Sequence, residues 1–285
     1  MPSLRSAPLA ALACLFVSSL LLRAQQPAGD SVPSPIGSSV FVWENLVAKP
    51  SGVGERRDVA RNPTATLREF ECHISTLNPS LASHPPHTHP QEELIVLREG
   101  ELDVHINGTN TRVGPGAVFF FAANDPHAVQ NRGDRPATYF VFNFSTAGTV
   151  AMRGRPPLPA DPGRLGSAIF HWDRLEAVPT KTGARRAITS LPTATMENFS
   201  CHVTTLRAGE APHESHRHAD EEIVFLKEGQ LDVTINGVTT RATPGSIVFV
   251  SSGDLHGWRN AGDTDATYYV IRVKTEATPV ALAAN

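Results

Sequence analysis

The sequence is poor in cysteine, in charge of one sign and in long hydrophobic runs. Three cysteines in 285 residues, with no C-x-x-C pair, exclude a disulfide-built scaffold and a thiolate zinc site. The net charge of −3 and the pI near 6.5 exclude the basic surface of a nucleic-acid-binding protein. With 40% hydrophobic and 19% charged residues, the composition is that of a globular chain and not a disordered one.

A single apolar run stands near the N-terminus. Leu9–Leu22 follows Arg5 and is shorter than the roughly 20 residues that a membrane-spanning helix requires. A short apolar run behind a positive charge is typical of an export signal, so residues 1–24 are predicted to be a signal peptide. We expect a protein exported to the periplasm or the outside of the cell, with no membrane segment after cleavage.

The remaining chain consists of two copies of one sequence unit, at an offset of 129 residues. Trp43 matches Trp172, and the tetrapeptide PTAT at 63–66 recurs at 192–195. A period of this length indicates a duplicated domain and not a solenoid. The predicted organisation is listed in chain order: an N-terminal linker at 25–36, domain 1 at 37–149, a Pro/Gly-rich linker at 150–165, domain 2 at 166–276 and a C-terminal tail at 277–285.

Each unit has the pattern of short antiparallel strands. In the first unit, residues 101–106 alternate in polarity and run into Asn107-Gly108, the dipeptide of a type I′ hairpin. Further strands are expected at 111–113 and 117–121, and the second unit repeats the whole pattern. Without an amphipathic helix between the strands, the pattern predicts an all-β fold made of two antiparallel sandwiches or barrels.

The twelve histidines are the feature in excess. His87 and His89 lie two residues apart, which on a strand places both imidazoles on one face. Glu93 and a later His127 add two further donors, and the second unit repeats all four donor types at the same spacing: His216, His218, Glu222 and His256. Imidazole and carboxylate together favour Mn, Fe, Ni, Cu or Zn. We therefore predict up to two divalent metal ions per chain.

These motifs resemble those of the cupin superfamily. The first motif of that family, G-x5-H-x-H-x3/4-E-x6-G, is matched from His87 to Gly100 and from His216 to Gly229, but Leu81 and Glu210 replace its leading glycine. In its second motif, the later histidine and an asparagine are kept, but Ala122 and Ser251 replace the proline. In the first repeat the motif's glycine is Asn124, a residue that tolerates the same left-handed backbone. The resemblance implies two tandem jelly-roll barrels, a bicupin, with two complete sites and with Mn or Fe as the first choice of metal.

Motif spacing also chooses between neighbouring acids. Glu92 and Glu221 fall one residue early and are expected on the opposite face of their strands, so Glu93 and Glu222 are the predicted ligands.

Other residues that coincide in the two repeats each have two alternative roles. His84 and His213, three residues before the first ligand of each site, are the candidate catalytic residues, with a plain position at the barrel rim as the alternative. His73 and His202 are either inward-facing partners of the site or ordinary core histidines. The two later cysteines are expected as buried thiols, with a disulfide between them as the alternative: Cys72 and Cys201.

The predicted site allows several functions, because cupins share a fold more than a reaction. The first hypothesis is a metal-dependent enzyme of oxygenase or decarboxylase type that acts on a small oxygen-rich molecule. The alternatives are a non-catalytic, metal-stabilised binding or storage protein, and an isomerase or lyase acting on sugars or sugar acids. The expected partner is a small molecule, and a homo-oligomer is possible.

Overall fold

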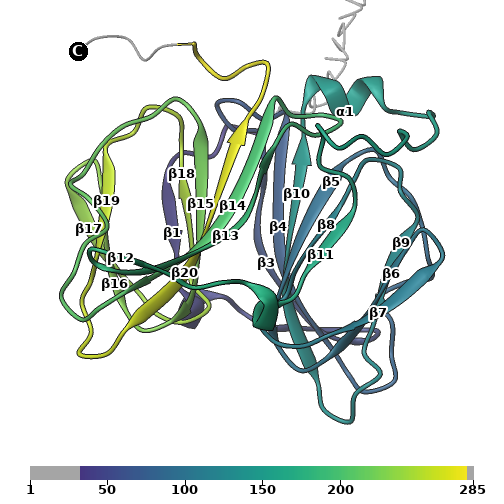
Figure 1. Ribbon diagram of the computed structural model, residues 1–285, viewed down its shortest axis with the longest axis horizontal. Helices are drawn as coiled ribbons and strands as arrows, with labels where there is room; N and C mark the ends of the chain where they lie inside the picture. Colours follow the sequence, from purple (N-terminus) through teal and green to yellow (C-terminus); the bar gives the residue numbers. More distant parts are fainter. Residues whose placement is uncertain (1–32, 281–285) are drawn as a thin grey trace, which may run out of the picture. The chain divides into compact units, whose positions relative to one another are not determined.

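Two seven-stranded antiparallel sheets dominate the computed structural model, which describes residues 33–280 (Figure 1). The predicted signal peptide therefore lies outside the described residues. Each large sheet is joined by a three-stranded sheet to form one jelly-roll barrel. Figure 1 shows the two large sheets facing each other at the centre and the small sheets at the two outer sides. The predicted all-β fold is confirmed.

In the first barrel, the strand Glu69–Leu77 alternates buried and half-buried side chains, and the strand Val118–Phe121 is buried throughout. Its large sheet has the order β11-β8-β5-β10-β4-β3-β2, and its small sheet the order β7-β6-β9. The bounds are β2 Lys49–Ser51, β3 Gly54–Asn62, β4 Glu69–Leu77, β5 Glu92–Glu99, β6 Leu102–Ile106, β7 Thr109–Val113, β8 Val118–Phe121, β9 His127–Gln130, β10 Ala137–Ser145 and β11 Ala168–Phe170.

The second barrel repeats this topology. Its large sheet has the order β1-β18-β15-β20-β14-β13-β12, and its small sheet the order β17-β16-β19. The bounds are β1 Ser39–Phe41, β12 Val178–Thr180, β13 Gly183–Leu191, β14 Asn198–Leu206, β15 Glu221–Glu228, β16 Leu231–Ile235, β17 Val238–Ala242, β18 Ile247–Val250, β19 His256–Asn260 and β20 Ala266–Lys274.

Helical structure is short in the described part of the chain. It consists of α1 at Ala147–Ala151 and two 3-10 turns, η1 at Trp43–Asn45 and η2 at Trp172–Arg174. No helix within residues 33–280 has the length and apolar character needed to cross a membrane.

The predicted turns have the expected backbone. Asn107 and Gly108 both have positive φ, 48° and 85°, as a type I′ hairpin requires. Asn124 also has a positive φ of 66°, where its counterpart Gly253 has 83°. The asparagine thus takes the left-handed conformation for which the family pattern has glycine.

The two repeats exchange their first strands. Strand β1, from the start of the first repeat, pairs with β18 of the second, and β11, from the start of the second repeat, pairs with β8 of the first. A shared apolar core lies between the large sheets, where Phe140 packs on Phe225 at a centroid distance of 4.0 Å. Each barrel also has an inner core of its own.

Candidate metal centres

The structure brings the three predicted histidines of each repeat together. In the first repeat, one ring nitrogen from each of His87, His89 and His127 lies within 4.8 Å of the other two. His216, His218 and His256 form the same cluster in the second repeat. Within residues 33–280, these two clusters are the groups in which three or more His, Cys, Asp or Glu side chains have ligand atoms within 4.8 Å of one another.

Backbone hydrogen bonds orient most of these rings. The carbonyl of Asp125 accepts from Nδ1 of His127 at 2.8 Å, and the carbonyl of Gln91 accepts from Nδ1 of His89 at 2.9 Å. The matching bonds in the second repeat run from His218 and His256 at 2.9 and 2.8 Å. Because a carbonyl only accepts, Nδ1 of these four rings carries a hydrogen and Nε2 is the nitrogen directed to the site, where Nε2 of His218 is hydrogen-bonded to Glu222.

Two of these Nε2 atoms are buried with no hydrogen-bond partner. They belong to His127 and His256, whose side chains are 2% and 1% exposed. A buried polar atom without a partner is costly, and a coordinated cation removes that cost. Burial also lowers the pKa of His127 to about 4, which keeps its imidazole neutral, the form that binds metal. The residues present therefore fit a divalent metal ion.

The predicted carboxylates lie beside the histidines. The Glu93 carboxylate is 3.5 Å from Nε2 of His89, and that of Glu222 is 2.7 Å from Nε2 of His218 and 3.7 Å from Nε2 of His256. Burial by itself would raise the pKa of Glu222, but the two imidazoles outweigh it and lower that pKa to about 2. Glu93 thus lies beside one imidazole of its cluster and Glu222 beside two, but neither carboxylate belongs to the groups whose donor atoms all lie within 4.8 Å of one another.

One local prediction is wrong. The segment through His87 and His89 is not a regular strand: His87 makes an isolated bridge to His127, with backbone bonds of 3.1 and 3.0 Å in the two directions. The second repeat has the same isolated bridge, between His216 and His256. The bridge still places the first and last histidines of the motif side by side.

The candidate catalytic histidines lie next to the clusters. The ring of His84 is 3.9 Å from that of His87, and the ring of His213 is 4.3 Å from that of His216. Both are at least partly exposed, and in each the carbonyl of the following residue accepts from Nδ1 at 3.0 Å. The structure thus places them at the mouth of each site with Nε2 free.

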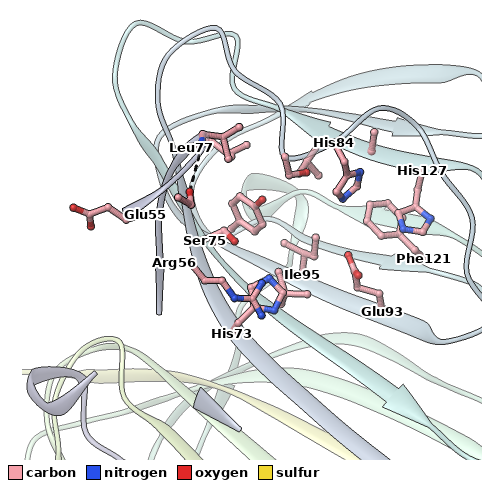
Figure 2. A pocket seen from close by; sticks show the side chains of 17 residues that line it. Glu55, Arg56, His73, Ser75, Leu77, His84, Glu93, Ile95, Phe121 and His127 are labelled. Atoms are coloured by element: carbon pink, nitrogen blue, oxygen red, sulfur yellow. Dashed lines mark hydrogen bonds between the residues drawn. The ribbon is translucent and has the colours of Figure 1, made fainter. Parts of the chain in front are cut away.

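A cavity of about 260 Å³ opens over each cluster. Figure 2 shows Glu93, His84 and His127 at one end of the first cavity, Arg56 and His73 close together at the other, and Glu55 pointing away. Phe121 lines this cavity and stacks on the ring of His127, with the ring centroids 4.2 Å apart. The volume suits a small molecule.

His73 and His202, whose roles the sequence left open, also line the cavities. His73 is bonded through Nδ1 to Glu71 at 2.7 Å, and His202 is held neutral because burial, followed by two nearby arginines, lowers its pKa to about 4. Both therefore belong to the walls of the sites and not to the shared core.

Two tyrosines of the cavity walls were not predicted. Tyr139 and Tyr268 are buried on β10 and β20, and burial raises the pKa of Tyr139 to about 12, so the phenol stays protonated. The chain has only three tyrosines, and these two coincide in the repeat. Rarity combined with repeat matching was the signal that could have found them.

The neighbouring acids have a different role from the ligands. Glu92 and Glu221 are fully buried and reach into the other repeat. Glu92 accepts bonds from the Thr195 hydroxyl at 2.6 Å and the Ala194 backbone N–H at 3.0 Å, and Glu221 accepts one from Thr64 at 2.6 Å. The opposite-face prediction is therefore right, and the repeated PTAT segments are the partners of these acids.

The two later cysteines are free thiols. Cys72 and Cys201 are both buried in the shared core. Burial raises the pKa of both thiols. The expectation of two buried thiols therefore holds, and the disulfide alternative does not.

Comparison with known proteins gives the class of the chain. A model of the cupin domain matches residues 73–143 and 202–272, one match in each repeat. No curated protein sequence matches the chain. The chain is therefore a bicupin, with two cupin domains in one polypeptide, and it belongs to the cupin superfamily.

Solved structures of low identity share this fold. AerE from Microcystis aeruginosa is 18% identical with a TM-score of 0.60, covering 80% of this chain and 97% of its own. An oxalate decarboxylase from Lactobacillus farciminis, in a formate complex, is 17% identical with a TM-score of 0.63, covering 87% and 90%. The Bacillus subtilis oxalate decarboxylase, in a structure of a point mutant, is 15% identical with a TM-score of 0.61, covering 85% and 79%.

Proposed function

We propose that this bicupin is a metal-dependent enzyme of oxygenase or decarboxylase type that acts on a small oxygen-rich organic molecule. The observation that carries the proposal is the buried, unpartnered Nε2 of His127 and of His256, in two histidine clusters that each have a carboxylate beside one of their rings and a small cavity next to them. A protein that needed an ion only for stability would not need a cavity over the ion in both repeats.

The residues of the site have separable tasks. His87, His89, His127 and Glu93 would hold the cation in the first repeat, and their four counterparts would hold it in the second. A bound divalent cation supplies Lewis-acid stabilisation of negative charge on a substrate oxygen. The neutral phenol of Tyr139 can donate a hydrogen bond into the first cavity, and Nε2 of His84 can take or give a proton at its mouth.

Manganese or iron is the proposed metal. Three imidazoles and one carboxylate suit both ions. One of the structurally similar proteins, the Bacillus subtilis oxalate decarboxylase, is described as having Mn(II) centres. At 15% identity that likeness extends to the fold, so manganese in this chain rests on the donor set.

Metal content and turnover together test the proposal. The purified protein should bind about two Mn or Fe ions per chain, and oxygen uptake or carbon dioxide release should appear with small organic acids or flavonols. Binding of two ions without turnover on any substrate would support the storage or binding alternative. Metal near zero, with no rise in thermal stability on adding Mn or Fe, would refute the metal site.

Single-site variants separate the two repeats. His87→Ala and His216→Ala should each leave about one metal ion per chain. Loss of a ligand should weaken the site more than the roughly 10- to 100-fold typical of a lost outer hydrogen bond. His105→Ala, outside both clusters, is the control and should keep both ions.

A further inference from the structure

The two cavities are lined by matching histidines, but the charged residues in their walls differ. In the first repeat, the single arginine of the cavity wall is Arg56, and two carboxylates neutralise it. Its guanidinium lies 2.9 Å from Glu71 and 2.8 Å from Asp58. Glu71 is also bonded to His73 and to Asn143, at 2.7 and 2.9 Å, and together these partners lower its pKa against the effect of burial. The first cavity therefore has no unpaired positive charge in its wall.

The matched arginine of the second repeat has neither partner. Arg185 lines the second cavity at the position of Arg56, but Ala187 and Ser200 stand where Asp58 and Glu71 stand in the first. Among residues 33–280, Arg185 makes no ion pair within 4.0 Å. Its guanidinium is exposed at the cavity wall and has no carboxylate partner there.

A second arginine stands in the same wall. Arg272 takes the place of Asn143 and lies on β20 directly opposite the metal ligand Glu222 on β15. Its Nη2 lies 3.0 Å from Asp220, so one carboxylate faces one end of the guanidinium. Nε of the same group is buried with no hydrogen-bond partner. The cavity wall therefore has two guanidinium groups and one carboxylate paired with them.

Other unpaired donors are found in the second cavity. Trp258, at the position of Val129, is 6% exposed, and its Nε1–H has no hydrogen-bond partner. Hydroxyl groups of Thr180, Thr182 and Thr204 complete that wall. Buried donors without acceptors are costly, and a ligand that offers only acceptor oxygens would satisfy them. The chemistry that fits is a small anion with several oxygens.

We propose that the second cavity is a binding site for small carboxylate anions, selected by Arg185 and Arg272, and that the first cavity does not bind them. Paired guanidinium groups recognise carboxylates through directed, charge-assisted hydrogen bonds. A cation held by His216, His218, Glu222 and His256 would bind a carboxylate oxygen on the side of the cavity where Arg272 lies opposite Glu222. This inference rests on the proposed function, because it assigns the substrate class of that site.

The test uses the full chain loaded with Mn and titrated calorimetrically with malonate, with neutral malonamide as the matched compound. We expect one malonate per chain and at least tenfold weaker binding of malonamide. Arg185→Gln and Arg272→Asn should each weaken malonate binding by more than about tenfold, the usual range for a hydrogen bond to a charged group. Arg56→Gln, the matched change in the first cavity, should leave malonate binding unchanged.

Exchange of the neutralising carboxylates between repeats gives a sharper set of variants. Ser200→Glu places beside Arg185 a carboxylate like that of Glu71, which neutralises Arg56 in the first repeat. This change should abolish malonate binding while the metal content stays the same. Asp58→Ala combined with Glu71→Ser frees Arg56 and should add a weaker second malonate site. Each new side chain already occurs at the matched position of the other repeat, so the fold accommodates all of them.

The outcomes separate this inference from the proposed function. Two Mn ions per chain with equal affinity for malonate and malonamide would overturn the anion site and leave the metal enzyme standing. Absence of metal, with malonate still bound through Arg185 and Arg272, would overturn the proposed function and keep the anion site. Inorganic phosphate binding more tightly than malonate would overturn the carboxylate assignment.

Discussion

At the scale of single residues, the protonation of the buried histidines is the central property of both sites: burial lowers the pKa of His127, whereas the neighbouring carboxylates outweigh burial and raise the pKa of His89 and of His256. A metal ligand must present an unprotonated nitrogen, and burial provides this for His127 by lowering its pKa to about 4. His202, which is not a ligand, is held at about 4 as well, by burial first and then by Arg185 and Arg272. Such groups gain protons when the chain unfolds, so they link stability to pH.

The metal-free protein should lose stability as the pH falls from about 6.5 towards 4. In that window the unfolded state binds a proton at His202 that the folded state does not, so the free energy of unfolding falls with pH and levels off below about 4. The expected contribution of His202 is on the order of 3 kcal/mol. Urea unfolding of the chelator-treated protein at several pH values measures it.

The variant His202→Gln isolates this contribution from those of the metal-binding histidines. Its stability should decline less steeply over the same window than that of the unmodified chain. Identical slopes for the two proteins would show that His202 takes up its proton equally in the folded and unfolded states.

At the scale of elements, the strand bearing each carboxylate ligand is anchored by the opposite repeat. Glu93 begins the inward face of β5, and Glu92 next to it is held by Thr193, Thr195 and the Ala194 backbone of the second repeat. Burial raises the pKa of Glu92, and these donors act against that rise. The position of a ligand in one site thus depends on a loop from the other.

Thr195→Val should destabilise the protein by about 1–3 kcal/mol, because it removes one of the three donors to a buried carboxyl group. Chemical denaturation measures the change. Thr239→Val, at an exposed hairpin position on β17, is the control and should stay within about 0.5 kcal/mol of the unmodified protein. An equal effect of the two changes would contradict an anchoring role for Thr195.

Sequence patterns predicted most elements of this fold but not their pairing across the repeats. Alternation and the Asn-Gly turns placed the hairpin strands, and strand parity separated Glu93 from Glu92. The segments Ser39–Phe41 and Ala168–Phe170, however, have the same short apolar character and face equivalent edges in two copies of one sheet. Local pattern cannot tell which copy a strand joins, because that choice depends on the path of the connecting chain.

The candidate sites divide in the same way. The histidines and ligand carboxylates could be predicted because their spacing is local and occurs twice. Tyr139, Arg185 and Arg272 lie on strands far from those motifs and enter the cavities only through sheet register. Their roles depend on the neighbours they meet in space, such as the presence of Glu71 or its replacement by Ser200.

At the scale of the whole molecule, the described residues hold together through the exchanged strands and the shared core. Strands β1 and β11 each complete a sheet of the other repeat, and Phe70 stacks on Phe249 at 5.4 Å between the large sheets. The connection between the repeats, by contrast, is exposed over residues 153–163. Noncovalent contacts and not the linker should therefore determine the association.

A protease site inserted in the linker at residues 156–160 tests this. After cleavage, the two fragments should elute together in size-exclusion chromatography and keep the thermal transition of the intact chain within a few degrees. Separation of the fragments under native conditions would show that the linker, and not the exchanged strands and shared core, keeps the repeats together. Uncleaved protein with the same insertion is the control.

The reciprocal exchange of β1 and β11 also has an evolutionary consequence. Two separate copies of one repeat could make the same contacts as a symmetric pair, but every substitution would then appear in both cavities at once. With both repeats on one polypeptide, one cavity can hold an arginine at Arg272 while the matched position in its twin holds Asn143. The fusion thus frees each site to diverge while the shared architecture still constrains both.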